Sequence, residues 1–425
     1  MSNYQSSTAP LFYLRYKWDY AFRKGFGTII RTVGENMDGT VLIEILKGIG
    51  RFFINPLFYV AIISAVYLGY RRVKRERRYF NRRILGGWSE LKNMLAMGFM
   101  LSVIISLFSL VIGLTVSLEL LTIVFIVSLA GMIIYLYQLL SPAIVMAVAF
   151  CGIVWMQWQD WSYTIGTIEL AGRNVTDELV MTVPIMTGLL LMAEGILIRR
   201  YGARFASPIV EKTKRGLNGI GYFSKQLWIL PVFTVIPGEG IQNFAPYWPQ
   251  FTIGAEQFSI IVFPFIIGFQ QMVRQKLPMN VYPQMGRSII MIGQFVLVVG
   301  LAAYLLPILG AAALALGAIS RTIIGIHYSR SEDRNSYAVV RSDKGVMIAG
   351  ILPDSPAEKM GLVAGEIIKR VNGQDVFTEE DLYKALQINA AHCRLEVLDH
   401  SGELRLAQHV VHRDDNHKIG LLVVS

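Results

Sequence analysis

Charged residues are scarce in this chain, and histidine is missing from its first three quarters. Of 425 residues, 16% are charged and 53% are hydrophobic, whereas soluble globular chains carry about 25% charged residues. All 6 histidines lie at or after position 327, so the apolar part lacks the two imidazoles of a zinc-protease HExxH motif. There is also no room for a catalytic domain with a Ser/His/Asp set. The sequence therefore predicts a membrane protein that is not an enzyme.

Cysteine is almost absent as well, which limits covalent and metal chemistry. Cys151 lies in an apolar run and Cys393 in the mixed C-terminal part; this separation argues against a disulfide, and two thiols do not complete a zinc site. His409, His412 and His417 are close in sequence, but their charged neighbours indicate a solvated surface rather than a metal site. We therefore expect no metal and no other cofactor.

The net charge of +10 is unevenly distributed along the chain. Residues 1–326 carry a net charge of +13 and residues 327–425 a net charge of −3. The positive charges stand in clusters beside apolar runs, which is the pattern that orients membrane proteins. We therefore expect contact with membrane lipid and no nucleic-acid partner.

Long apolar runs dominate residues 51–326, the predicted membrane domain. A helix needs about 20 apolar residues to cross a bilayer. The final run, 288–320, exceeds this length and carries Pro307, so we expect it to cross twice, near 288–306 and 308–320. The domain then has eight or nine helices. The candidate spans are 52–70, 94–116, 118–138, 141–157, 179–198, 226–238, 257–272 and 288–320.

Basic segments predict which loops face the cytoplasm. The segments 71–92 and 199–225 are rich in Lys and Arg, whereas the loops 158–178 and 239–256 are not. The positive-inside rule places the first two in the cytoplasm and the other two outside. With two crossings in the last run, the C-terminal module is cytoplasmic. Residues 1–50 form an N-terminal segment with an amphipathic pattern that favours an interfacial position.

Two features leave a transport function open. The proline-broken runs 226–238 and 257–272 resemble the discontinuous helices of transporters, but no second half repeats them. Glu194 is the one clear charge inside a span, and intramembrane charges are often functional. Its position near Arg199 and Arg200 favours pairing or snorkelling toward the membrane surface.

The module after the 327–336 linker has strong local signals. The stretch GVMIAGILPDSPAEKMGLVAGEIIKRVNGQDV predicts a strand, a helix with Ser355 as N-cap, a strand and an Asn372-Gly373 turn. A helix capped by Thr378 follows. This order resembles a PDZ domain of the bacterial, rearranged type, over residues 337–425. The resemblance implies binding of an extended peptide as an added strand.

The same resemblance supplies candidate peptide-binding residues. Ile419-Gly420-Leu421 is the nearest match to the family's carboxylate-binding loop, and Leu382 and Leu386 are candidates for the groove beside it. Two other interpretations stay open. Ile419–Leu421 can be part of an ordinary buried strand, and the two leucines can belong to the contact between helix and sheet.

The chain as a whole, over roughly residues 45–425, resembles the MinJ family of cell-division topological determinants from Gram-positive rods. The segments RFFINPLFYVAIISAVYLGYRRVKRERRYF, MAEGILIRRYGARFASP and LWILPVFTVIPGEG carry this resemblance together with the PDZ domain. It implies an α-helical polytopic membrane bundle followed by a small α+β PDZ domain.

The family resemblance also implies a function. The expected protein is a non-enzymatic scaffold at septa and poles that connects DivIVA to MinD, and through MinD to MinC and the FtsZ ring. Contacts with other division proteins are implied too, and the oligomeric state stays open. The alternatives are a transporter or channel with a regulatory PDZ domain, and a membrane tether for a protease or secretion complex.

Overall fold

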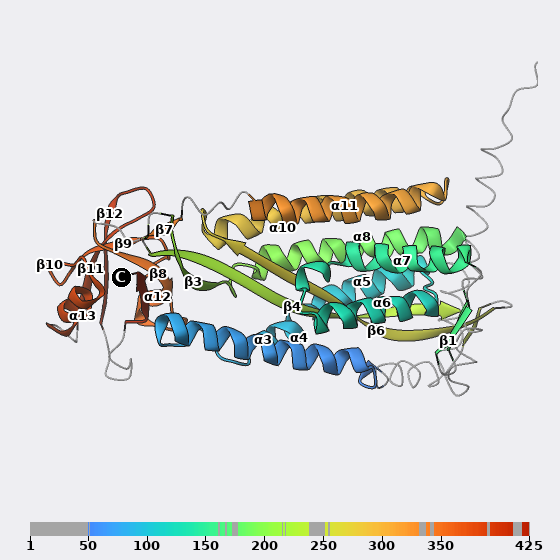
Figure 1. The fold of residues 1–425 in the computed structure, drawn as a ribbon, viewed down its shortest axis with the longest axis horizontal. Helices are drawn as coiled ribbons and strands as arrows, with labels where there is room; N and C mark the ends of the chain where they lie inside the picture. Colours follow the sequence, from blue (N-terminus) through green and yellow to red (C-terminus); the bar gives the residue numbers. More distant parts are fainter. Residues whose placement is uncertain are drawn as a thin grey trace, which may run out of the picture.

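The computed structural model places a helical bundle at one end of the long axis and the PDZ domain at the other (Figure 1). Part of the chain falls outside the description, including residues 1–49 and hence the predicted amphipathic segment. The described residues are 50, 52–159, 162–165, 168–171, 177–214, 216, 218–237, 251–253, 256–330, 337–340, 344–388, 392–410 and 419–424.

Apolar helices confirm that the chain is a membrane protein. Four helical segments among the described residues are long and apolar enough to cross a membrane: Ser89–Ile112, Leu179–Tyr201, Pro278–Ala302 and Ile308–Ser329. Two shorter apolar helices accompany them. The helices of the bundle are α3 (Pro56–Phe80), α4 (Ser89–Ala96), α5 (Phe99–Ile112), α6 (Leu118–Ile133), α7 (Pro142–Trp158), α8 (Asp177–Tyr201), α10 (Pro278–Ala302) and α11 (Ile308–Arg330), with the one-turn helix η1 (Tyr137–Leu139) between α6 and α7.

The run 288–320 does divide into two helices, as its length predicted. α10 ends before Pro307 and α11 begins directly after it. α11 then continues to Arg330, four residues past the boundary at 326 that the composition indicated. The helical structure extends further than the apolar run because a helix does not need apolar residues once it leaves the bilayer.

The expectation that 226–238 and 257–272 are helices is wrong. Residues 226–237 and 257–272 lie in two long antiparallel strands, β4 (Asn218–Pro237) and β6 (Glu256–Val273), which run through the bundle beside the helices (Figure 1); residue 238 lies outside the described residues. Proline explains the difference. Inside a helix, proline removes a hydrogen bond and clashes with the preceding turn, whereas Pro231 and Pro264 oppose each other in the strand register, where each only lacks a donor.

The β4–β6 ribbon has hydrogen-bond partners beyond its own two strands, which matters because backbone polar groups must be satisfied inside a membrane. Besides the bonds between the strands, the N–H of Phe233 donates to Ser106 Oγ at 3.0 Å, and the N–H of Gly268 donates to the Leu140 carbonyl at 3.0 Å. The outer edges of the ribbon are thus bonded in part by neighbouring helices and turns. Such partners lower the number of unpaired backbone groups that the two strands present within the helical bundle.

Glycines bring α8 and α10 into close contact. A Cβ on Gly195 would lie 2.7 Å from the Gly286 carbonyl oxygen, and one on Gly188 would lie 2.9 Å from that of Gly293. The two pairs repeat at seven-residue spacing along both helices, which run antiparallel. Small residues permit such close helix packing in membranes, where lipid supplies no hydrophobic drive between helices.

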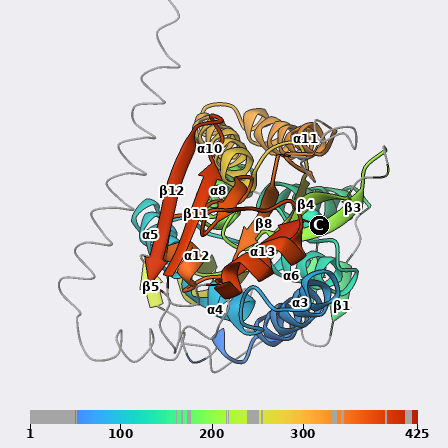
Figure 2. The same ribbon diagram turned by 90° about the vertical axis from the view of Figure 1, so that its left-hand side faces the viewer.

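The C-terminal domain is built on a six-stranded sheet (Figure 2). Its strand order is β12-β11-β9-β8-β13, and the short strand β10 pairs with β9. Thus β13 is an end strand of the sheet. The elements are β8 (Val346–Ile351), α12 (Pro356–Lys359), β9 (Ile367–Val371), β10 (Gln374–Asp375), α13 (Glu379–Ile388), β11 (His392–Leu398), β12 (Leu404–Val410) and β13 (Leu421–Val424).

Local signals in this domain are confirmed in detail. Ser355 caps α12 by accepting from the Glu358 N–H. Thr378 and Asp381 form a reciprocal capping box at α13, with bonds of 3.2 and 3.1 Å. Asn372 has a φ of 51°, as its tight turn requires.

Candidate peptide-binding site

The predicted carboxylate-loop residues lead directly into the end strand of the PDZ sheet. Gly420 has a φ of 85°, a left-handed conformation that favours glycine, and its added Cβ would collide with Ser355. The Ile419 carbonyl accepts from the Ala357 N–H at 2.9 Å, and the Gly420 carbonyl from the Leu352 N–H at 2.8 Å. This turn is therefore fixed against the start of α12, and β13 leaves it in a defined direction.

Within the described residues, β13 pairs with another strand along one edge, and the side chains on both of its faces are packed in apolar clusters. It pairs antiparallel with β8, from Leu421 opposite Ile351 onward. Leu421 and Val423 belong to the apolar core of the PDZ domain, while Leu422 belongs to a separate cluster shared with the membrane region. Among the described residues no strand pairs with its second edge. An extended peptide can add there in the manner of PDZ ligands.

The two leucines of α13 differ in exposure. Leu382 is 1% exposed and lies in the PDZ core, while Leu386 is only partly buried and packs against that core. Ile419 and Leu421 belong to the same core as Leu382. The structure thus brings the five candidate residues into one neighbourhood, but Leu386 is the leucine that keeps exposed surface on the helix.

A strand that the sequence assigned to the PDZ domain joins the other sheet. β7 (Val339–Val340) pairs with β4 at Gly219 and Ile220. On its other edge, the same part of β4 pairs with β3 (Ser207–Lys212). The pairing of β6 with β4 ends at Val273, opposite Tyr222. β7 takes the place of β6 along the same edge of β4, and it therefore belongs to the sheet of the membrane region.

Polar contacts hold the two parts together at this junction. The hydroxyl of Tyr222 on β4 donates to the Ala349 carbonyl on β8 at 2.8 Å. Arg274 and Tyr337 both bond Glu211, at 2.7 and 3.0 Å. The hydrogen bond to Glu211 raises the pKa of Arg274, and burial raises the pKa of Tyr337, with Glu211 adding to that effect. The PDZ domain is thus docked on β4 beside the site at β13.

Glu194 has a different partner from the one its position indicated. It accepts two bonds from Arg321 on α11, at 2.8 and 2.7 Å, and one from Ser141 at the start of α7, at 2.6 Å. Arg199 and Arg200 lie in the last turn of the same helix. Glu194 is 0% exposed, so it is fully enclosed rather than turned toward the membrane surface. The pair fixes α8, α11 and α7 relative to one another.

The described part of the chain shows no metal site and no reactive thiol at Cys393. No group of three His, Cys, Asp or Glu residues that could hold a metal occurs there; His412 and His417 lie outside it. Both cysteines are free. Burial raises the pKa of the Cys393 thiol to about 12, so at neutral pH this thiol is protonated and a poor nucleophile.

Sequence reasoning missed the parts of the structure that depend on contacts between distant segments. The α8–α10 glycines do carry a signal, because Gly188, Gly195 and Gly202 are spaced by seven residues, as are Gly286, Gly293 and Gly300. The Arg321–Glu194 pair has no such signal, since 127 residues separate its members.

Comparisons with known proteins identify a PDZ domain in this chain and relatives that match along most of its length. A family model described as a PDZ domain matches residues 347–398. The chain is 30% identical over 383 residues to the cell division topological determinant MinJ of Bacillus subtilis, covering 90% of this chain and 96% of that protein. A probable MinJ of Lacticaseibacillus paracasei is 22% identical over 382 residues, which cover 87% and 96% of the two chains. A probable periplasmic serine endoprotease of the DegP-like type from Marinomonas matches over 62 residues, at 42% identity, which is 14% of this chain and 13% of that protein.

Proposed function

The chain belongs to the MinJ family of cell division topological determinants, and from that premise we propose that it is a non-enzymatic membrane scaffold for division-site selection. In this proposal it links DivIVA at septa and poles to MinD. Through MinD it acts on MinC and keeps FtsZ rings from reassembling at used sites. The observation that carries the proposal is the similarity along nearly the whole of both chains, membrane region included.

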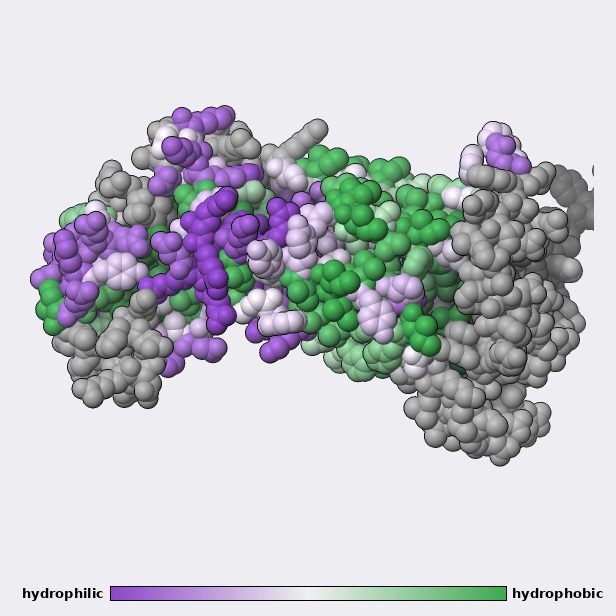
Figure 3. Space-filling view, turned by 60° about the horizontal axis from the view of Figure 1, so that its bottom comes forward, coloured by the Kyte–Doolittle hydropathy of each residue, from purple (hydrophilic) through white to green (hydrophobic). Residues whose placement is uncertain are grey.

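The distribution of charge supports a cytoplasmic PDZ domain. The last turns of α3 and α8 carry Arg77, Arg78, Arg199 and Arg200, and both helices end on the side where the PDZ domain lies (Figure 1). Space filling shows hydrophilic residues at that end and hydrophobic ones over the helices (Figure 3). By the positive-inside rule this end faces the cytoplasm, where DivIVA and MinD are found.

The architecture supplies a physical reason for membrane attachment. A PDZ domain docked on a membrane bundle searches for partners in two dimensions, which raises its effective concentration toward other membrane-bound proteins. We propose the second edge of β13 as the binding edge, with Ile419-Gly420-Leu421 at its start and Leu386 beside it. Leu382 supports this site from the core.

Localisation tests the scaffold proposal. A fluorescent fusion of the full chain is expressed in a Gram-positive rod that lacks its own MinJ. We expect enrichment at septa and poles and fewer misplaced divisions. A uniform membrane signal combined with solute-dependent growth contradicts the scaffold and favours a transporter.

Partner binding tests the proposed edge of β13. We compare Leu386→Gln with Lys384→Gln, a change at an exposed position of the same helix, in a two-hybrid assay against DivIVA and MinD. Loss of either signal in Leu386→Gln alone supports the site. Equal signals in both variants contradict a role for Leu386.

Thiol labelling of intact cells tests the orientation. Cys393 is 3% exposed and therefore a poor reporter, so we place a cysteine at exposed Lys384 in a chain that carries Cys151→Ser and Cys393→Ala. Labelling by an impermeant maleimide only after cell lysis supports a cytoplasmic domain. Labelling in intact cells contradicts the scaffold mechanism.

A further inference from the structure

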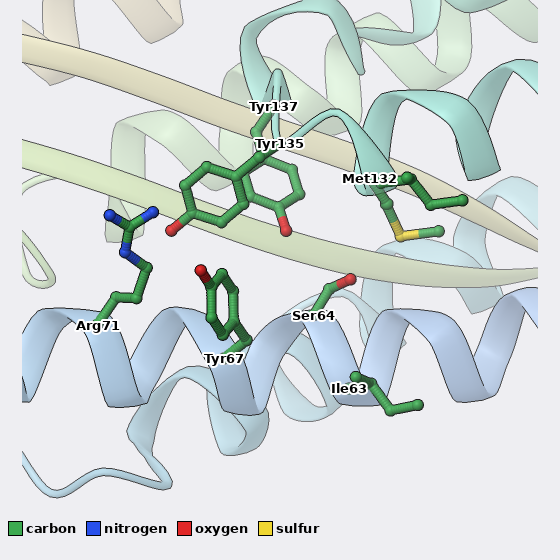
Figure 4. Close-up of a pocket in the computed structure, with 8 residues that line it drawn as sticks. Ile63, Ser64, Tyr67, Arg71, Met132, Tyr135 and Tyr137 are labelled. Atoms are coloured by element: carbon green, nitrogen blue, oxygen red, sulfur yellow. The ribbon is translucent and has the colours of Figure 1, made fainter.

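A cavity of about 250 Å³ opens between α3 and the turn after α6. Its polar side is formed by hydroxyl groups that converge from two segments far apart in the sequence (Figure 4). No carboxylate is among the lining residues. These are Ile63, Ser64, Tyr67, Arg71, Met132, Ile133, Tyr135 and Tyr137.

Three basic side chains lie at or near the polar side of this cavity; Arg71 lines it, whereas Lys225 and Arg75 lie outside its lining and contact aromatic rings. The Arg71 guanidinium lies over the rings of Tyr67 and Tyr135, at 5.7 and 5.4 Å from their centroids. Lys225 of β4 donates to the Tyr135 carbonyl at 2.8 Å and lies over the same ring. Arg75, one turn beyond Arg71, stacks on Phe223, and its buried Nε has no hydrogen-bond partner among the described residues.

The nearest acidic group is already engaged. Glu76 accepts from Arg72 at 2.7 Å, from the Ile84 N–H at 2.8 Å and from Ser207 at 3.1 Å. Arg72 also pairs with Glu90. Glu76 and Glu90 thus carry two negative charges against the one positive charge of Arg72, and Glu76 also attracts Arg75. Arg71 is the basic side chain that lines the cavity, and it has no bonded carboxylate among the described residues, so an anion in the cavity would meet its guanidinium.

The opposite side of the cavity is apolar and faces outward. Ile63 is 67% exposed and Ile133 is 71% exposed; Ile63 lies in the apolar first part of α3 and Ile133 at the end of the apolar helix α6. Arg71 begins the basic part of α3, directly after its apolar part. The cavity thus lies where hydrocarbon gives way to headgroups, a depth at which tyrosine is enriched.

The conformation of Tyr135 is a further sign of a formed site. Its φ is 66°, a left-handed value that is uncommon for a bulky residue and persists only where surrounding contacts impose it. Lys225 and the rings of Tyr67 and Tyr137 make such contacts. These contacts hold the Tyr135 ring next to two basic side chains, Arg71 and Lys225.

We propose that this cavity binds the phosphate of an anionic phospholipid, with Arg71 and the tyrosine hydroxyls around the headgroup, Lys225 next to them on Tyr135, and an acyl chain against Ile63 and Ile133. Basic pockets between membrane helices on the cytoplasmic side are known to hold anionic headgroups. The cavity is smaller than the ~300–1,000 Å³ of pockets that enclose a whole small molecule, which fits a headgroup whose tails stay in the bilayer.

Native mass spectrometry of the purified full-length protein tests the proposal. The protein in neutral detergent is titrated with phosphatidylglycerol, with phosphatidylcholine as the neutral lipid. We expect preferential retention of phosphatidylglycerol. Changing Arg71 and Lys225 to Gln together should weaken its apparent Kd about tenfold or more, since the headgroup then loses the basic side chains at the polar side of the cavity.

A matched variant separates a site from general surface charge. Changing exposed Lys74 and Arg78 to Gln removes the same formal charge from positions of α3 that do not line the cavity, and we expect it to leave phosphatidylglycerol retention nearly unchanged. Equal loss in both double variants overturns the proposal. So does full competition by millimolar inorganic phosphate, because that result assigns the cavity to a free anion.

A variant that lacks a single hydroxyl group keeps the proposal testable if the double variant does not fold. Tyr67 is 47% exposed, so Tyr67→Phe should fold normally, which its thermal unfolding in phosphatidylcholine checks. We expect a several-fold weaker Kd for phosphatidylglycerol in this variant. If the Arg71 and Lys225 variant does not fold, an unchanged Kd in Tyr67→Phe overturns the proposal.

Discussion

One ion pair of the membrane region and one of the PDZ domain differ strongly in their exposure to water. Arg321 and Glu194 have side chains that are 3% and 0% exposed, whereas Arg370 and Asp375 in the PDZ domain are 49% and 57% exposed. Both pairs have an N···O distance of 2.7 Å. The two pairs have the same N···O distance but should contribute differently to stability, because water competes for the exposed pair and not for the buried one.

Packing differs between the same two regions. α8 and α10 meet through glycine, so their backbones nearly touch. The PDZ domain instead encloses larger apolar side chains such as Leu382, Ile368 and Val371 between its helices and its sheet. In lipid, helices associate through close fit, and in water through removal of apolar surface. The same kind of substitution should therefore change the free energy of unfolding by different amounts in the two regions.

Breaking the buried pair should have the largest effect. Arg321→Met leaves Glu194 buried beside Ser141 without its cation, and removing one partner of a buried pair costs about 3–5 kcal/mol. Equilibrium unfolding of the full chain in detergent measures this loss.

The double variant Glu194→Gln with Arg321→Gln is the control for the buried pair. It leaves no lone charge, so it should recover a large part of the stability. If Arg321→Met alone is as stable as the wild type, the pair does not hold the bundle.

Adding one methyl group between α8 and α10 should have the next largest effect. In Gly195→Ala the new Cβ would meet backbone atoms of Gly286 and Ile290 at 2.7 and 2.9 Å, and overpacking costs about 1–3 kcal/mol. Gly152→Ala is the matched control, because its nearest neighbour is the end of the Ile123 side chain at 3.5 Å. There alanine should be neutral or stabilising by up to ~1 kcal/mol. Equal unfolding midpoints for the two variants contradict the close-packing account.

The sequence predicted more structural detail in the PDZ domain than in the bundle, for a physical reason. Caps and turns such as Ser355, Thr378 and Asn372-Gly373 act within a few residues, so the sequence displays them directly. Apolar character predicted membrane passage for 226–238 and 257–272, but not whether they are helices or strands. That choice depends on partners such as Ser106 and on cross-strand pairing, which lie far away along the chain.

The candidate site was predictable only as a set of residues. The PDZ resemblance located Ile419–Leu421 and the α13 leucines, but the docking of β13 on β4 through Leu422 and Tyr222 follows from tertiary contacts alone. Short-range rules do not reach contacts between segments roughly 200 residues apart.

Removing a helix cap in the PDZ domain should have an intermediate effect. Thr378→Ala deletes the hydroxyl that accepts from the Asp381 N–H, and loss of an N-cap typically costs about 1 kcal/mol. Amide hydrogen exchange in α13 measures the local change. Protection of α8 should stay the same, and a parallel loss there contradicts the independence of the two regions.

The same cap gives α13 a pH dependence with a definite sign. The hydrogen bond with Thr378 lowers the pKa of Asp381 in the folded state. Its stabilising effect is therefore fully present above the unfolded pKa, about 3.9, and disappears as the pH falls through the folded value. The difference in α13 protection between wild type and Thr378→Ala should be larger at neutral pH than in acid. A difference that grows in acid contradicts the assignment.

The smallest effect is expected at the exposed pair. Arg370→Gln removes the bond to Asp375 on the β9–β10 hairpin, and the hydrogen bond to Asp375 raises the pKa of Arg370 in the intact pair. Exposed pairs contribute little because water and salt screen them. The unfolding midpoint should therefore match that of the wild type at physiological salt, and any difference at low salt should shrink as salt is added. A loss as large as that of Arg321→Met would show that exposure does not set the strength of these pairs, which would remove the physical basis of the comparison between the two regions.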